Sequence, residues 1–150
     1  MIKAMKSWLC AALLLSGANF ATASDVKPIS LTAGIHLIQA EVATTHATRM
    51  RGLMHRKTLD GNHGMVFVFP EEGRHCMWMR NTYVPLSVAF IDDRGAIVNI
   101  EDMVPQTEDQ HCAAQPVRYA LEMSKGWFAA RGLKPGMRVS GLEQVPGAEE

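Results

Sequence analysis

The sequence lacks several features that mark specialised classes of protein. It has no internal repeat and no low-complexity linker, and after residue 23 it has no apolar segment long enough to cross a bilayer, which takes about 20 residues. It also lacks an excess of positive charge. When Lys3 and Lys6 are removed with the first 23 residues, the 15 Lys and Arg fall to 13 against 15 Asp and Glu. This balance argues against a nucleic-acid surface, which needs a basic stripe.

Familiar catalytic motifs are missing as well. Ser87, Ser124 and Ser140 have no glycine-flanked nucleophile elbow, and no glycine-rich phosphate loop occurs. The neighbouring carboxylates Glu71-Glu72 and Glu101-Asp102 are typical of solvated loop charges, because side chains adjacent in sequence usually diverge in space. The sequence therefore identifies no catalytic residue, and we expect no cofactor.

Residues 1–23 have the three parts of an export signal. Lys3 and Lys6 supply the positive start, Trp8 to Leu15 form an apolar run, and Ala21-Thr22-Ala23 supply small residues for cleavage before Ser24. A membrane anchor is the alternative, but polar and small residues interrupt the run soon after it begins. We expect a cleaved signal peptide and a protein exported to the periplasm or beyond it.

Cleavage would leave two cysteines, Cys76 and Cys112, each preceded by a histidine. An even pair of cysteines in an oxidising compartment favours a disulfide. It would close a loop of about 37 residues and stabilise the fold by roughly 4 kcal/mol in the chain-entropy model. The bridge would also anchor the otherwise irregular stretch 103–116.

A metal site is the competing interpretation of the His-Cys pairs. A histidine and a cysteine adjacent in a strand point to opposite faces, so one pair is poorly placed to ligate one ion. His75, Met77 and Met79 would share a strand face and therefore remain an alternative copper site. Methionines in a strand are more often core residues, so our first expectation is no metal.

Beyond residue 34 the apolar residues recur mostly with the period of two that is typical of strands. A hydroxyl cap at Thr44-Thr45 opens a short helical pattern that ends near Gly52. We expect a lead-in over 24–34, one domain over 35–142 and a tail over 143–150. The predicted strands are 35–42, 65–69, 76–81, 86–91, 96–101, 119–123 and 137–142, with a second short helix over 127–131. The expected fold class is β-rich α+β: one compact domain of about seven short strands, curled into a barrel-like or sandwich sheet with two short helices.

Four motifs resemble those of the DUF192 (UPF0127) family. In chain order they are Arg51-Gly52-Leu53-Met54, Gly64 to Phe69, Met77 to Thr82 with its continuation to Asp92, and Tyr119-Ala120-Leu121-Glu122-Met123. The resemblance covers residues 35–142 and implies a small β-rich fold, but no activity and hence no catalytic residue. Two residues depart from the family pattern: Arg80 stands where Lys is common, and Ser87 stands where Asp often follows Pro-Leu.

A polar cluster in an apolar setting is the candidate ligand site. An aromatic ring beside a guanidinium and an amide is a plausible floor for a small polar or sugar-like ligand. A purely structural role is the alternative: Trp78 would belong to the core, Asn81 and Thr82 would close the bend before Pro85, and Arg80 would pair with Glu122. The predicted ligand-binding residues are Arg51, Trp78, Arg80, Asn81, Thr82 and Glu122.

Two classes of function stay open at this point. We favour a non-enzymatic accessory or small-ligand binding module of the cell envelope, because no catalytic set is found. The alternative is a small hydrolase or carbohydrate-modifying enzyme that uses the surface from Trp78 to Thr82. Expected partners are a small polar ligand or an envelope protein, not nucleic acid. After signal cleavage the protein should not span a membrane and should be a monomer.

Overall fold

The structure, a computed structural model, describes residues 28–149, and within them the chain forms nine strands and two α-helices. The predicted signal peptide, residues 1–23, lies outside this part. No helix in residues 28–149 combines the length and the apolar character needed to cross a membrane. In chain order the elements are β1 (Ile29–Ala33), β2 (His36–Ala43), α1 (His46–Arg51), β3 (His63–Gly73), β4 (Cys76–Met77), β5 (Leu86–Ile91), β6 (Ile97–Met103), β7 (His111–Cys112), β8 (Val117–Ser124), α2 (Trp127–Ala130) and β9 (Val139–Ser140), followed by a short 3-10 helix (Leu142–Gln144).

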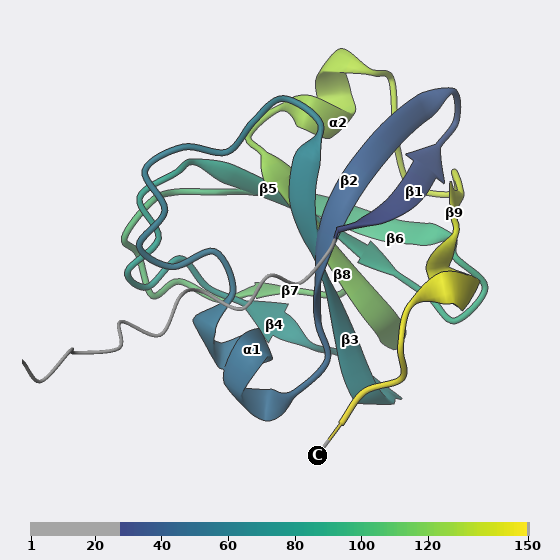
Figure 1. The fold of residues 1–150 in the computed structure, drawn as a ribbon, viewed down its shortest axis with the longest axis horizontal. Helices are drawn as coiled ribbons and strands as arrows, with labels where there is room; N and C mark the ends of the chain where they lie inside the picture. The colour runs from purple at the N-terminus through teal and green to yellow at the C-terminus, as the bar shows by residue number, and fades with distance from the viewer. Residues whose placement is uncertain (1–27, 150) are drawn as a thin grey trace, which may run out of the picture.

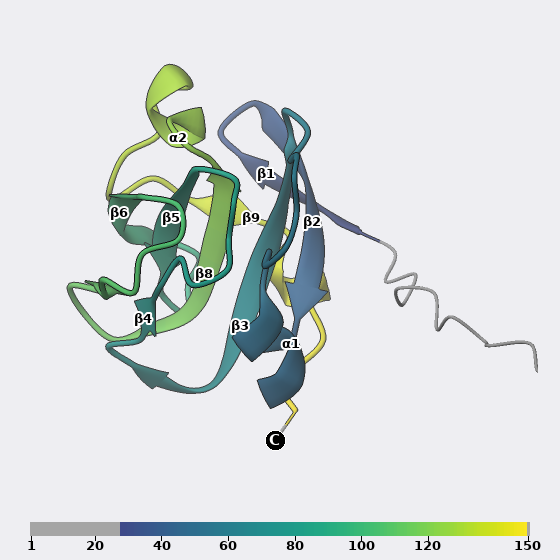
Figure 2. The same cartoon turned by 90° about the vertical axis from the view of Figure 1, so that its left-hand side faces the viewer.

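Seven strands form one curled sheet in the order β6-β5-β8-β3-β2-β1-β9. Neighbouring strands are antiparallel except β2 and β3, which are parallel because the chain returns through α1 and a long loop before β3 begins. The two ends of the sheet approach each other where the Val139 amide donates to the Gly95 carbonyl at 2.9 Å. The sheet is therefore curled into a half-barrel. Helix α2 lies at the top of this half-barrel in Figure 1, and α1 lies at the bottom (Figures 1 and 2).

The central strands β3, β5 and β8 are buried on both faces, so the sheet separates two hydrophobic clusters. The inner core fills the curl of the sheet and includes Val66, Leu121 and the α2 residue Phe128. The outer core lies on the opposite face and includes Phe67, Val88 and other residues of the same strands. This alternation follows from the period of two in a strand, which sends successive side chains to opposite faces.

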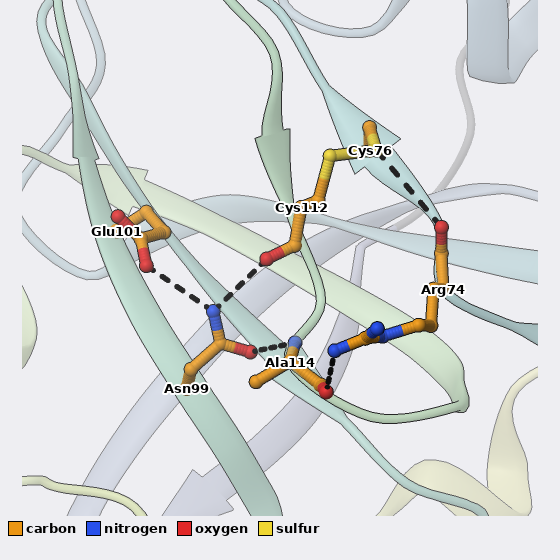
Figure 3. The surroundings of a disulfide bond; sticks show 6 residues. All are labelled: Arg74, Cys76, Asn99, Glu101, Cys112 and Ala114. Carbon is orange, nitrogen blue, oxygen red and sulfur yellow. Dashed lines mark hydrogen bonds between the residues drawn. A yellow bond between two sulfur atoms is a disulfide. The ribbon is translucent and has the colours of Figure 1, made fainter.

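A two-stranded sheet of β4 and β7 covers part of the outer core. Cys76 and Cys112 face each other in this pair and are joined by a disulfide, as predicted. Asn99 of β6 fixes the β7 segment, because its amide nitrogen donates to the Cys112 carbonyl at 3.1 Å and its oxygen accepts from the Ala114 amide at 3.0 Å (Figure 3). The disulfide and Asn99 together hold this part of the irregular connection against the sheet.

The β-rich α+β fold class is confirmed, but several boundaries differ from expectation. The lead-in predicted for 24–34 contains β1, whose buried Leu31 and Ala33 alternate with exposed Ser30 and Thr32. Pro70, expected to break a strand, lies within β3. The strand predicted for 76–81 stops at Met77, because the chain bends there and the Thr82 amide returns to the Met79 carbonyl at 3.0 Å.

Candidate functional site

A cavity of about 200 Å³ lies on the outer-core side of the sheet, between α1 and the segment that follows the disulfide. Its floor comes from β3 and β8, one wall from α1 and the turn after it, and the opposite wall from residues 76–82. The side chains and backbone around it are His46, Arg49, Met50, Arg51, Gly52, Leu53, Met54, Phe67, Phe69, Cys76, Met77, Trp78, Thr82 and Glu122.

Helix α1 is held at the cavity by caps at both ends. The Thr45 hydroxyl accepts from the Thr48 amide at 3.1 Å, and the Thr48 hydroxyl accepts from the Thr45 amide at 3.0 Å, which together form a capping box. Gly52 ends the helix with a φ of 46°, and a Cβ at this position would lie 3.2 Å from the Phe67 ring. Only glycine meets both requirements easily, so Gly52 positions α1 against the aromatic floor.

The two arginines of α1 play different parts. Arg49 donates hydrogen bonds to the main-chain carbonyls of Thr44 and Val68, the second at 3.1 Å, so it ties the helix to the end of β2 and to β3. Arg51 lies exposed in the last turn, and its guanidinium forms no hydrogen bond or ion pair with any residue in the described part of the chain. Arg51 is thus the free guanidinium at the cavity.

Glu122 is the carboxyl group at the floor of the cavity. It lies in β8 between Met65 of β3 and Val88 of β5, and it points to the outer core because it follows Ala120 by two residues. It is only 3% exposed, and its carboxyl forms no hydrogen bond or ion pair with any other residue within 28–149. Within residues 28–149 no side-chain oxygen is fully buried without a hydrogen-bond partner. The Glu122 carboxyl, which has no partner, must therefore be accessible from the cavity.

Burial raises the pKa of Glu122 from 4.5 to about 8. Removal of the carboxylate from water disfavours its charged form. At neutral pH the side chain is therefore mainly a carboxylic acid, which can donate one hydrogen bond and accept others. A protonated acid in an apolar hollow is the main chemical feature of this cavity.

Four of the six predicted ligand-binding residues meet at the cavity. Arg51, Trp78, Thr82 and Glu122 line it, whereas Arg80 and Asn81 are exposed outside it. The two fall outside because the strand expected through Asn81 ends at Met77, so the expected alternation of faces does not extend to them.

The alternative pairing of Arg80 with Glu122 is wrong. Arg80 lies over the Trp78 ring at 5.7 Å and pairs with Glu108 at 3.6 Å. Asn81 has a φ of 54°, and its carbonyl accepts from the His55 amide at 2.9 Å, so it shapes the bend.

Sequence reasoning missed most of the α1 contribution. His46, Arg49 and Met50 line the cavity, and none of the three is among the residues predicted from the sequence. Their spacing held a usable signal, because His46 and Met50 are four residues apart and so share one side of a helix. Cys76 also reaches the cavity, so the disulfide forms part of its wall.

The three residues of the alternative copper site occupy different surroundings. The His75 ring stacks on Phe69 at 3.8 Å, and its Nε2 lies 2.8 Å from the Glu71 carbonyl. Met79 is fully buried in the outer core, and Met77 borders the cavity. In residues 28–149 no group of three or more His, Cys, Asp or Glu side chains is arranged to hold a metal ion. Copper binding stays a prediction that this geometry does not favour.

Comparison with known proteins gives the family. The sequence profile of DUF192, described as "Uncharacterized ACR", matches residues 29–141. The chain belongs to the DUF192 family. No functionally curated protein matches it.

Two crystal structures of similar proteins share the fold of this DUF192 domain. One, from Sinorhizobium meliloti, is described as a candidate transcription regulator; it is 36% identical, has a TM-score of 0.71, and the match covers 76% of this chain and 92% of that one. The other, from Novosphingobium aromaticivorans, is described as a protein of unknown function; it is 34% identical, has a TM-score of 0.70, and the match covers 75% of this chain and 83% of that one.

Proposed function

We propose that this DUF192 domain is a non-enzymatic binding module of the cell envelope, and that its cavity takes a small, largely apolar ligand bearing a polar group. The observation that carries the proposal is the buried, unpartnered carboxyl of Glu122 at the floor of the cavity. The ligand would supply the hydrogen-bond partner that the protein does not.

The energetic cost of Glu122 supports a role in binding. The Glu122 carboxyl has no partner in the described chain and reaches solvent only through the cavity, which costs the folded state free energy. An apolar side chain of similar size would pack against Met65 and Val88 without that cost. A ligand group that bonds the carboxyl would recover part of this energy. Predominantly apolar walls with a few convergent polar groups are also the usual make-up of a small-molecule site.

The composition of the walls defines what the ligand body would contact. Phe67, Phe69 and Trp78 supply aromatic surface, and Leu53 and Met54 supply aliphatic surface. Methionine and aromatic side chains adapt to flat or branched apolar groups. The ligand that fits best therefore has an apolar body and few polar atoms, rather than the many hydroxyls of a sugar.

An enzyme that uses Glu122 is the second candidate, because a carboxyl with a raised pKa is suited to general acid catalysis. Glycoside hydrolysis normally needs two carboxyl groups facing one bond. Glu122 is the one carboxyl side chain in the described lining of this cavity. The geometry thus supports binding better than carbohydrate hydrolysis.

The envelope location is part of the same proposal. The predicted signal peptide directs export, and a structural disulfide such as Cys76–Cys112 persists in oxidising compartments. The description of the Sinorhizobium protein suggests that it regulates transcription, a role that involves binding to nucleic acid. The near balance of acidic and basic residues in this chain offers no support for that role.

A fragment screen by protein-observed NMR tests the proposal. We expect small apolar compounds with one polar group to shift the amide signals of Gly52, Leu53 and Met77. Met50→Trp should block these shifts, because Met50 is 46% exposed and borders the cavity. Leu37→Trp is the matched control, since Leu37 is 50% exposed and lies outside the lining. Hits that survive Met50→Trp, or the absence of any hit at the cavity, would overturn the proposal.

A further inference from the structure

We infer that the ligand is a small organic anion, whose apolar body fills the cavity and whose anionic group is held at the opening by Arg51. This inference rests on the proposed function and adds the chemical class of the ligand. It is carried by the distribution of charged and apolar side chains around the cavity.

Basic side chains surround the opening of the cavity. Arg49 and Arg51 of α1 both line it, together with His46 from the start of the same helix. The acidic side chain in the described lining is Glu122, which lies at the floor and is mainly uncharged at neutral pH. A ligand that enters therefore meets a positive opening and a neutral interior, which favours an anionic head group over a cationic one.

Arg51 differs from the other arginines near it in having no partner. Arg49 is bonded to main-chain carbonyls, Arg56 forms two 2.6 Å hydrogen bonds with Glu41, and Arg80 pairs with Glu108. Arg51 has no such bond within the described chain and is exposed beside the cavity. A guanidinium binds carboxylate and related anions through paired hydrogen bonds, so Arg51 is the group available for the head of the ligand.

Glu122 determines which group the ligand can place at the floor of the cavity. As an uncharged acid it can donate a hydrogen bond to a carbonyl or hydroxyl oxygen, or receive one from a hydroxyl. An ammonium group at the same place would pair with the carboxylate only after Glu122 had released its proton to solvent, and the ligand would first have to pass the basic side chains of α1. Both steps count against a cationic ligand and leave an anion with an apolar or weakly polar tail as the best match.

Three compounds with one body and different heads test the inference. They are 4-phenylbutyrate, 4-phenylbutylamine and 4-phenylbutanol, which are anionic, cationic and neutral at pH 6.5. All three have a phenyl tail that offers no hydrogen bond to Glu122, so a difference in their affinities reports on the head group alone. Each is titrated into the processed, disulfide-bonded protein at low ionic strength, and Kd is obtained from amide shifts. We expect 4-phenylbutyrate to bind about tenfold more tightly than the other two, the order of magnitude of one charge-assisted hydrogen-bonded contact.

Arg51→Gln and Arg80→Gln separate the role of Arg51 from a general loss of positive charge. Both arginines are exposed, but only Arg51 lines the cavity. Arg51→Gln should weaken 4-phenylbutyrate about tenfold and leave 4-phenylbutanol unchanged, whereas Arg80→Gln should leave both affinities within about twofold. Thermal unfolding of the two variants verifies that both are folded.

The outcomes that overturn the inference are distinct from those that overturn the proposed function. Equal affinity for the three heads, or unchanged 4-phenylbutyrate binding in Arg51→Gln, rejects an anionic ligand while leaving the cavity a binding site. If none of the three compounds shifts the cavity amides, the anionic class is rejected as well. The fragment screen then decides separately whether the cavity binds any other class of compound.

Discussion

Gly64 of β3 lies so close to Glu122 of β8 that a Cβ at position 64 would stand 2.3 Å from the Glu122 main-chain carbonyl oxygen. The two strands pair antiparallel at this point, with Gly64 opposite Met123. The absence of a side chain at Gly64 therefore allows β8 to approach closely at the residue that forms the floor of the cavity. The packing of the sheet and the placement of Glu122 depend on the same contact.

Gly64→Ala should destabilise the fold, because the added methyl group would force β3 and β8 apart. Overpacking of this kind costs about 1–3 kcal/mol, and urea unfolding of the variant would measure it. Gly61→Ala is the matched control, since a Cβ there meets no atom within 4 Å. Equal stability of the two variants would show that the strands are less tightly packed than described.

Glu122 should make the stability of the protein fall as the pH rises. Its pKa in the folded protein, about 8, lies above the unfolded value of 4.5, so the native state binds the proton more tightly. The stabilisation of the folded state by this proton is fully present below pH 4.5. Between pH 4.5 and 8 the native state retains a proton that the unfolded state releases. Stability is then lost by up to about 1.4 kcal/mol per pH unit.

Comparison with Glu122→Gln isolates this effect. The amide does not titrate, so the variant should lack the decline between pH 4.5 and 8, and the difference between the two unfolding free energies should change with pH. Glu108→Gln, at an exposed site, should retain the decline of the native protein. Parallel curves for native protein and Glu122→Gln would contradict a raised pKa for Glu122.

Reduction of the Cys76–Cys112 disulfide should lower stability by about 2–4 kcal/mol, because the bridge restricts the unfolded chain. Both cysteines are exposed, so a reductant can reach them. Urea unfolding with and without reductant measures the effect, and alkylation followed by mass determination verifies the redox state. The Cys76→Ser/Cys112→Ser variant should be less stable and insensitive to reductant; a response of this variant would point to a different cause.

Arg49 and Arg51 should differ in their effects on stability, although they lie two residues apart in α1. Arg49→Met removes the bond to the Val68 carbonyl and should cost about 1–2 kcal/mol. Arg51→Gln breaks no bond within the described chain and should change the unfolding free energy by less than about 0.5 kcal/mol. A large loss in Arg51→Gln would mean that Arg51 is structural and not held free for a ligand.

The predictable parts of the fold are those with several residues of periodic pattern. β5 and the cap at Thr45 occur where the sequence predicts them, because five apolar residues in a run of six and a hydroxyl before a helical pattern are local signals. β7 was missed, since its two residues carry no period and are placed by pairing with β4. β1 does carry an alternating pattern, but over only five residues, which is a weak signal for a strand.

The candidate site was predictable only in part for a similar reason. Trp78 and Glu122 stood in family motifs, but their meeting at one cavity depends on tertiary packing across β8 and the bend after β4. The prediction for Arg80 depends on a strand that keeps Arg80 on the same face as Trp78, and that strand ends earlier in the structure. Arg49 was overlooked because a basic helix face reads as solvated until the carbonyls that it bonds are known.

Intermolecular NOEs between 4-phenylbutyrate and the processed protein test the account most directly. We predict contacts from the phenyl protons to Leu53, Met54 and Met77, which line the cavity above Glu122. Contacts confined to exposed apolar residues elsewhere, such as Ile35 and Leu37, would contradict the assignment of this cavity as the binding site.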